Sequence, residues 1–311
     1  MLGFLGLDSV TYGVDDIGHA TKFFRDWGLT LVSESAKETI FETLEKSRVI
    51  LRHKDDPDLP PAIESGPTIR QVNWGVQSGK ALDSLRDKVG ALTEEAVDGA
   101  FSCQDANGLT VRFQKSICRK TDAVGTPTNT IDTPLRIDRP APVYERAHPV
   151  RLSHVVFFVD DLEAQREFYC EKLGFQVTDE YPGRGIFLRC NRNGPHHDMF
   201  LLMTPDKKRG VNHLSFGLRD IYEVMGGGLH FSKCGYETQL GPGRHPVSSA
   251  FFWYFFSPGG GLVEYYADED YCTENWKSRQ LEPTPENYAQ WAIIGGIDPK
   301  TRRQNMRAPK K

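Results

Sequence analysis

An internal repeat constrains the fold of this chain more than any other feature of its sequence. Residues 7–16 read LDSVTYGVDD and residues 152–161 read LSHVVFFVDD, so one pattern recurs in both halves. In each copy an apolar strand leads into the VDD turn, and an amphipathic helix, a glycine and another apolar strand follow. The aspartate pair stands where a helix N-cap belongs, near the positive end of the helix dipole. We therefore expect a duplicated scaffold.

Each half also holds a second, weaker copy of the unit. Residues 72–76 (VNWGV) resemble 214–218 (LSFGL), and residues 107–111 (NGLTV) resemble 260–264 (GGLVE). The sequence therefore predicts an α+β protein of four βαβββ modules paired into two domains. The expected divisions are an N-terminal domain at 1–118, an irregular Thr-, Pro- and Asp-rich linker at 119–149, a C-terminal domain at 150–270 and a tail at 271–311.

The most informative positions are those where the two halves differ, because a duplicated scaffold needs only one active site. Three aligned positions carry metal-type residues in the second half alone: His154 against Ser9, His213 against Gln71, and Glu264 against Val111. Two imidazoles and one carboxylate form the facial arrangement of non-haem iron(II) oxygenases. A lone strand histidine is more often a core residue, but three such residues at equivalent ends of paired modules favour a metal site. The sequence thus predicts a metal in the C-terminal domain and none in the N-terminal domain.

The residues around this predicted site resemble a known signature. Residues 241–245 (GPGRH), residues 252–260 (FWYFFSPGG) and Glu264 resemble the motif of the type I extradiol ring-cleaving dioxygenases in the vicinal oxygen chelate (glyoxalase/bleomycin resistance/dioxygenase) superfamily. Catechol 2,3-dioxygenase and 2,3-dihydroxybiphenyl 1,2-dioxygenase are members of this kind. The resemblance covers about residues 4 to 270 and is specific in the second half. Ser257 departs from the aspartate that many members carry, which affects the turn more than the chemistry.

This resemblance implies both a fold and a set of roles. Each domain is expected to form an open, incomplete β-barrel. Iron(II), or manganese(II) with the same ligand set, would be held by His154, His213 and Glu264. His197 would act as the acid–base residue, and His245 and Tyr254 would hydrogen-bond the ring oxygens. The reaction implied is extradiol cleavage of a catechol-type ring by O2.

Strand geometry adds two expectations of its own. Tyr254 and Glu264 flank the turn at 257–260 symmetrically, so a regular hairpin would place them opposite each other. His196 and His197 are neighbours, so their side chains should point to opposite faces of a strand and only one can line the pocket. The pairing of His197 with Asp198 and the spacing in the family that the chain resembles favour His197, which leaves His196 at the rim or on the surface.

Composition excludes several functional classes. The 311-residue chain has a net charge of −4, too near neutral to suggest a nucleic-acid groove. No window approaches the roughly 18 apolar residues of a membrane-spanning helix, and the start lacks the basic region of a signal peptide. The six cysteines include no CxxC pair, which is typical of reduced thiols in a cytoplasmic protein. We expect a cytoplasmic homo-oligomer.

Other functions on the same scaffold stay open at this stage. They are a metal-dependent isomerase or thiol transferase, a ligand-binding protein without catalysis, and a dioxygenase that opens para-diols. The substrate itself is not determined. Arg184, Arg189 and Arg244 could meet a substrate carboxylate, although surface arginines are the commoner explanation. The tail at 271–311 could cover the pocket as a lid or pack on the outer surface.

Overall fold

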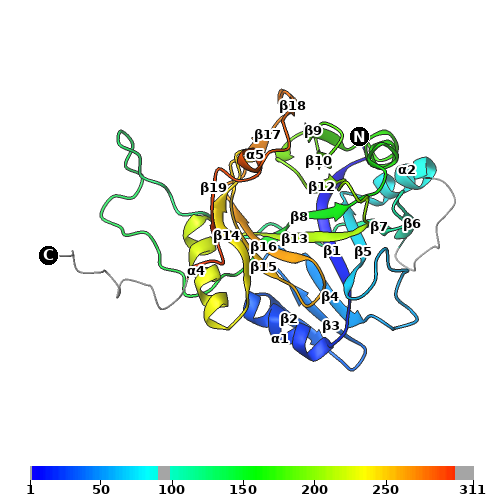
Figure 1. Cartoon of the computed structure of the whole chain (residues 1–311), viewed down its shortest axis with the longest axis horizontal. Helices are drawn as coiled ribbons and strands as arrows, with labels where there is room; N and C mark the ends of the chain where they lie inside the picture. Colours follow the sequence, from blue (N-terminus) through cyan, green and yellow to red (C-terminus); the bar gives the residue numbers. More distant parts are fainter. Residues whose placement is uncertain (1, 90–98, 298–311) are drawn as a thin grey trace.

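The computed structural model describes residues 2–89 and 99–297. Within these ranges the chain forms a seven-stranded sheet from its N-terminal half and a ten-stranded sheet from its C-terminal half, with a small two-stranded sheet beside them (Figure 1). The N-terminal elements are β1 (Phe4–Val14), α1 (Ile17–Trp27), β2 (Thr30–Glu34), β3 (Glu38–Glu42), β4 (Arg48–His53), β5 (Thr68–Val76), α2 (Gly79–Val89), β6 (Phe101–Gln104) and β7 (Thr110–Lys115).

In the C-terminal half, the helix that follows the first strand changes its pitch. Helix α3 continues directly into a π-helical stretch, η1. The elements of this half are β8 (Arg151–Phe158), α3 (Leu162–Arg166), η1 (Glu167–Lys172), β9 (Gln176–Tyr181), β10 (Gly185–Arg189), β11 (Gly194–Pro195), β12 (Met199–Leu202), β13 (Gly210–Gly217), α4 (Ile221–Lys233), β14 (Thr238–Arg244), β15 (Phe251–Phe256) and β16 (Leu262–Ala267). The tail adds β17 (Tyr271–Cys272), β18 (Arg279–Gln280), α5 (Pro285–Tyr288) and β19 (Trp291–Ile294).

The central strands of the two large sheets have the same order and the same directions, which confirms the predicted duplication. Four central strands run in the order β4-β1-β5-β7 in the first sheet and β12-β8-β13-β16 in the second. In both sets the middle pair is antiparallel and each outer pair is parallel. Three modules show the expected βαβββ order. The second module shows β5, α2, β6 and β7, and its residues 90–98 lie outside the described part of the chain.

The VDD turns start helices for the predicted reason. Asp16 accepts a hydrogen bond from the backbone N–H of His19 at 2.9 Å, and Asp161 accepts one from that of Ala164 at 2.9 Å. Both aspartates are therefore N-caps. Helix α1 ends at Gly28, whose φ of 104° favours glycine.

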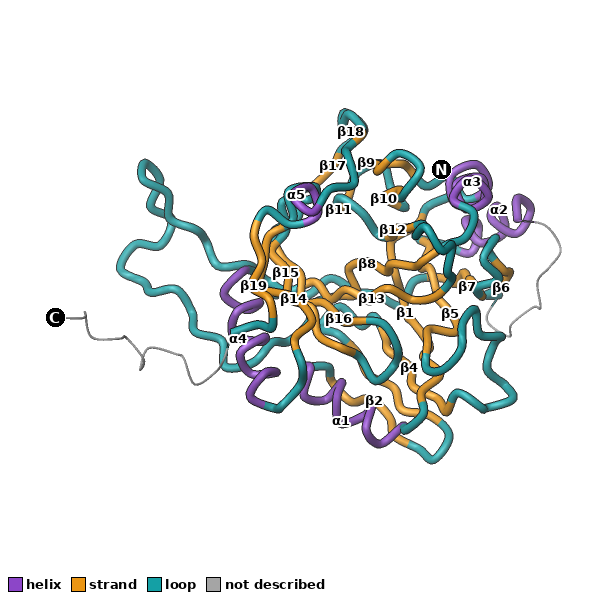
Figure 2. Tube along the Cα trace, in the orientation of Figure 1, coloured by secondary structure: helices purple, strands orange, loops and turns teal. Residues whose placement is uncertain are grey.

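The two halves share one hydrophobic core. The indole of Trp27 stacks on the ring of Tyr265 with 3.6 Å between ring centroids, and Phe4 packs edge-on against Phe175 at 5.1 Å. Helices α1 and α4 lie side by side across the junction (Figure 1). The chain between β7 and β8, all of it described, forms no helix or strand and projects as a long loop (Figure 2). The domain division at 119–149 stays a prediction.

One predicted correspondence between the halves is wrong by one residue. The hairpin before β7 closes with Asp105 N–H donating to Leu109 O at 3.0 Å, and the hairpin before β16 closes with Ser257 N–H donating to Gly261 O at 3.2 Å. This register matches Gly108 to Gly260, whereas the alignment of the repeats matched Gly108 to Gly261. Arg112, not Val111, therefore occupies the position that corresponds to Glu264.

Among the described residues, no helix has the length and apolar character needed to span a bilayer.

Candidate metal centre

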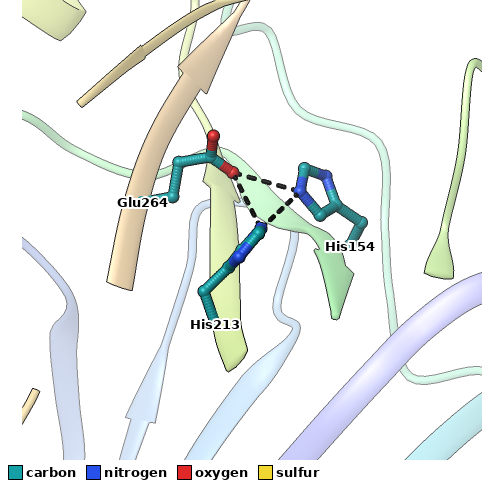
Figure 3. Close-up of side chains that lie close together, drawn as sticks. All are labelled: His154, His213 and Glu264. Atoms are coloured by element: carbon teal, nitrogen blue, oxygen red, sulfur yellow. Dashed lines mark hydrogen bonds and ion pairs between the residues drawn. The ribbon is translucent and has the colours of Figure 1, made fainter. Parts of the chain in front are cut away.

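Three neighbouring strands bring His154, His213 and Glu264 together. His154 lies on β8, His213 on β13 and Glu264 on β16, and these strands are adjacent in the sheet. Figure 3 shows the two imidazoles and the carboxylate pointing toward one another. The Nε2 atoms of the histidines lie 3.1 Å apart, and Glu264 Oε2 lies 3.0 Å from His154 Nε2 and 3.5 Å from His213 Nε2. All three side chains are buried.

The chemistry of this cluster fits a divalent cation. Both carboxylate oxygens of Glu264 are buried, and neither accepts a hydrogen bond of normal geometry, although both lie within ion-pair distance of histidines. A buried carboxylate without hydrogen-bond donors is costly unless a cation compensates it. One nitrogen from each imidazole and one carboxylate oxygen lie within 4.8 Å of one another. This donor set suits iron, manganese or zinc.

The protonation states of the cluster also suit metal binding. Burial lowers the pKa of His213 to about 3, so its imidazole is neutral at neutral pH. The Nδ1 atom of His213 lies 2.7 Å from Asn212 Oδ1, which can only accept, so Nδ1 carries the proton and Nε2 presents its lone pair. Burial opposes ionisation of Glu264, but the adjacent imidazoles of His154, His245 and His213 hold the pKa of this carboxyl well below its usual range. The result is an anionic carboxylate beside a neutral imidazole donor.

The predicted site residues follow the order of the strands in the sheet. Glu264 pairs with Tyr254 across the β15–β16 hairpin, as the sequence predicts. His197 stands two residues before β12, and His245 directly follows β14. The strands β12-β8-β13-β16-β15-β14 thus carry six predicted residues in turn: His197, His154, His213, Glu264, Tyr254 and His245. Extended strands side by side therefore bring residues that are up to 110 positions apart onto one concave face.

His245 and Tyr254 form a hydrogen-bonded pair beside the cluster. The Tyr254 hydroxyl lies 3.1 Å from His245 Nε2, and His245 Nδ1 lies 2.7 Å from the carbonyl oxygen of Tyr288. Burial and the charge of Glu264 raise the pKa of Tyr254 well above its usual value, so its hydroxyl keeps its proton and donates. Both groups can therefore point hydrogen-bonding atoms into the space in front of the cluster.

The structure places His197 at the cavity and corrects the expectation for its neighbour. His197 lines the cavity, and its ring centroid lies 4.0 Å from that of His154. Burial, followed by the nearby histidines, lowers the pKa of His197 well below its usual value. His196 does not reach the cavity, but it is fully buried and lies 2.8 Å from Asp179, so its prediction as a rim or surface residue is wrong. Strand β18 of the tail covers this edge of the sheet, which alternation along one strand could not reveal.

In front of the cluster lies a cavity of about 230 Å³ with mostly apolar and aromatic walls. Besides the site residues, it is lined by Val156, Tyr181, Phe187, Phe200, Leu202, Asn212, Val247, Ser248, Tyr266 and Tyr288. None of the described residues that line it is Lys or Arg. Arg184, Arg189 and Arg244 all lie elsewhere, and Arg189 is a buried donor to Thr178 rather than a surface residue. Tyr288 belongs to the tail that was expected either to cover the pocket or to pack on the outer surface, and it lines the cavity. Its individual role was not predicted, because the tail has no counterpart in the repeats.

Comparison with known proteins agrees with the expected family. Residues 151–265 match the model of the Glyoxalase/Bleomycin resistance protein/Dioxygenase superfamily. The chain is 33% identical to metapyrocatechase 2 of Cupriavidus necator over 41% of this chain and 39% of that protein. It is 31% identical to 3-methylcatechol 2,3-dioxygenase of Pseudomonas putida over 40% and 44%. These matches span about two fifths of the relatives' length.

Solved structures extend the likeness to nearly the whole chain. A Mn(II)-bound glyoxalase from Novosphingobium aromaticivorans has a TM-score of 0.74 at 23% identity, over 94% of this chain and 93% of that chain. Homoprotocatechuate 2,3-dioxygenase from Arthrobacter globiformis has a TM-score of 0.69 at 18% identity, over 96% and 94%. At these identities the likeness shows the fold. The α+β vicinal oxygen chelate fold and the resemblance to extradiol dioxygenases are both confirmed.

Proposed function

We propose that this chain, whose C-terminal half belongs to the glyoxalase/bleomycin resistance/dioxygenase superfamily, is an extradiol dioxygenase that opens catechol-type rings with O2. The observation that carries this proposal is the order of six polar side chains along six adjacent strands, from His197 to His245, around one apolar cavity. An isomerase or a thiol transferase would not need His197, His245 and Tyr254 together. A binding protein without catalysis would not need the His154, His213 and Glu264 cluster.

The metal would be iron(II), held by His154, His213 and Glu264, with manganese(II) as the alternative. When bound, such an ion would supply Lewis-acid chemistry that lowers the pKa of a substrate hydroxyl and would provide open positions for the diol and O2. A neutral His213 and an ionised Glu264 leave a net positive centre, which suits a substrate that binds as a monoanion. The mostly apolar walls of the cavity would limit the water around this centre.

The remaining polar residues would position the ring and handle its protons. The Tyr254 hydroxyl and His245 Nε2 lie within 3.1 Å of each other and would hydrogen-bond the ring oxygens. On the other side of the cluster, His197 would take up a proton from the substrate and return it as the ring opens. The products of cleavage beside the diol are yellow hydroxy-oxo-dienoic acids or semialdehydes.

The cavity walls favour an uncharged catechol. Val156, Phe187, Phe200, Leu202 and Val247 supply most of the apolar surface beyond the cluster. A substituent carboxylate placed there would be buried without a cationic partner, which is unfavourable. Alkyl- or aryl-substituted catechols are therefore the expected substrates.

Homo-oligomer formation and a cytoplasmic location stay predictions.

The proposal is tested by anaerobic loading of the purified chain with iron(II) or manganese(II), followed by oxygen uptake across a panel of catechols. We expect about one metal per chain, uptake of one O2 per catechol and a yellow product. Hydroquinone, in which the hydroxyls are para, should give no uptake. A chain that binds the metal and consumes no O2 with any catechol would contradict the proposal, and preferential turnover of hydroquinone would assign it to the para-diol class.

A further inference from the structure

We propose that His196 is a positioning residue that fixes the ring orientation and the tautomer of His197 through a chain of contacts beginning at Asp179. The catalytic meaning of this inference rests on the proposed function, whereas the tautomer itself does not. The observation behind it is a continuous line of hydrogen-bond contacts. The line runs from the buried carboxylate of Asp179 through the imidazole of His196 to that of His197. None of these contacts involves the metal cluster.

The line begins at a carboxylate that the tail holds in place. Asp179 on β9 is fully buried, and its Oδ1 accepts the backbone N–H of Arg279 at 2.7 Å. The Arg279 Nε donates to Asp179 Oδ2 at 3.1 Å, and the indole N–H of Trp276 lies 3.4 Å from Oδ1. Strand β18 pairs with β9 so that Arg279 lies directly opposite Asp179. The tail therefore supplies both the charge partner and the orientation of this carboxylate.

His196 connects Asp179 to the cavity. Its Nε2 lies 2.8 Å from Asp179 Oδ2, and its Nδ1 lies 3.2 Å from Nδ1 of His197. Arg279 already compensates the charge of Asp179, so a second cation is not needed there. Burial lowers the pKa of His196, with Asp179 opposing it, which also favours the neutral imidazole.

These contacts determine which nitrogens carry protons. An ionised carboxylate only accepts, so His196 Nε2 carries the proton of the neutral ring and its Nδ1 is a lone pair. The contact between the two Nδ1 atoms then requires a proton on His197. His197 Nδ1–H therefore donates, and its Nε2 is left unprotonated on the opposite side of the ring. That is the form able to accept a proton from a bound diol.

Packing supports the same orientation. The ring of Phe187 lies edge-on to both His196 and His197, at 5.5 Å and 5.2 Å between centroids. The His196 ring is itself packed edge-on against Trp276 at 5.9 Å. His196 is thus enclosed between the cavity wall and the tail, where a ring flip would break both of its nitrogen contacts. The tail acts on the acid–base residue through this buried imidazole.

The substitution Asp179→Asn tests this line, because it removes an acceptor on which the line depends. Asp179 Oδ2 accepts from the Arg279 side chain and contacts His196 Nε2, whereas Oδ1 accepts the backbone N–H of Arg279. Asparagine supplies an oxygen at only one of these two positions, so its NH2 group must face a donor at the other. The proton of His196 is then no longer confined to Nε2, and His197 should populate both of its tautomers. Glu180→Gln is the matched control, since its carboxylate on the same strand pairs with Arg166 instead.

The tautomers are read by ¹⁵N-histidine NMR of the full-length metal-free chain, with His197 assigned from the spectrum of His197→Phe. We expect only Nδ1–H on His197 in the wild type and Glu180→Gln, and a mixture of Nδ1–H and Nε2–H in Asp179→Asn. After iron(II) loading, Asp179→Asn and His196→Phe should lose about 10- to 100-fold in kcat. Their metal content and anaerobic catechol affinity should stay unchanged.

The outcomes separate the inference from the proposed function. A wild-type His197 with its proton on Nε2 would overturn the inference, even if neither variant folds. Full turnover by His196→Phe would do the same. A wild type with the expected tautomer that opens no catechol would refute the proposed function alone.

Discussion

The carbonyl oxygen of Tyr288 lies 2.7 Å from Nδ1 of His245, so the C-terminal tail contacts a predicted catalytic residue directly. A carbonyl only accepts, which means that His245 Nδ1–H donates and His245 Nε2 is free to accept from Tyr254. A second contact ties the same helix to the cavity wall, because the Tyr181 hydroxyl donates to Asn287 O at 3.0 Å. Helix α5 therefore holds two residues of the cavity in place.

Removing α5 and β19 should weaken substrate binding more than metal binding. A chain shortened to residues 1–282 keeps Arg279 but loses the partner of His245 and the Tyr288 ring. We expect the anaerobic Kd for catechol to rise about 5- to 30-fold, as for the loss of roughly 1–2 kcal/mol of hydrogen bonding and packing. Isothermal titration checks this, with a chain ending at residue 297 as the control. An unchanged Kd would remove the tail from substrate binding.

Glu264→Gln should abolish most metal binding while preserving shape. The amide is isosteric with the carboxylate but lacks its charge, and Glu264 is fully buried between two imidazoles. Loss of a supporting group near a metal typically costs 10- to 100-fold in affinity, so loss of a ligand charge should exceed about 100-fold. Metal analysis after iron(II) loading and desalting measures it. Wild-type stoichiometry in this variant would contradict the assignment, and His197→Phe, which should retain its iron, is the control.

Much of this site could be predicted from the sequence because it depends on the repeat. Strand periodicity and the VDD turns fix which strands pair, and the paired strands β8, β13 and β16 bring His154, His213 and Glu264 together. The same reasoning placed Tyr254 opposite Glu264. The sequence pattern was sufficient to predict the position of a site residue wherever that residue and its neighbours lie on strands that follow the repeat.

The failures occur where the repeat gives no information. The alignment to Val111 failed because glycines alone cannot show which one has the same place in a turn, whereas the closing hydrogen bonds of the two hairpins select Arg112. His196 was placed on the surface because its partner Asp179 lies on another strand and its cover comes from the tail. The first error concerns the register of two equivalent turns, and the second concerns a contact with the tail, which has no equivalent in the other half.

Uncharged catechols should be turned over more efficiently than carboxylated ones. Burying a carboxylate without a partner costs about 3–5 kcal/mol, which corresponds to more than about 100-fold in kcat/KM. Steady-state oxygen uptake with 3-methylcatechol and 3,4-dihydroxyphenylacetate compares the two classes. Leu202 occupies a half-buried position of the cavity wall. Leu202→Arg should reduce the difference in kcat/KM between the two substrates, because the arginine provides a cation for the carboxylate. Equal kcat/KM values in the wild type would show that the carboxylate remains in solvent.

Glu269 should make the stability of the metal-free chain depend on pH. Its Oε2 is buried without a partner, and burial together with the nearby Asp198 raises the pKa of Glu269 to about 8, although Arg151 opposes this. In the unfolded chain the pKa of Glu269 is near its ordinary value of 4.5. The folded state therefore binds the proton more tightly. The contribution of protonated Glu269 to the free energy of unfolding is fully present below about pH 4.5 and is lost as the pH rises toward about 8.

Glu269→Gln should remove this dependence, because the amide stays neutral in both states. We expect the variant to be more stable than the wild type by about 1–3 kcal/mol at pH 7.5 and equal to it near pH 4.5. Urea unfolding at a series of pH values measures the difference, and Glu163→Gln, at a side chain that is 80% exposed, is the control. A variant that is less stable at pH 7.5 would show that Glu269 is ionised in the folded chain and bound by Arg151.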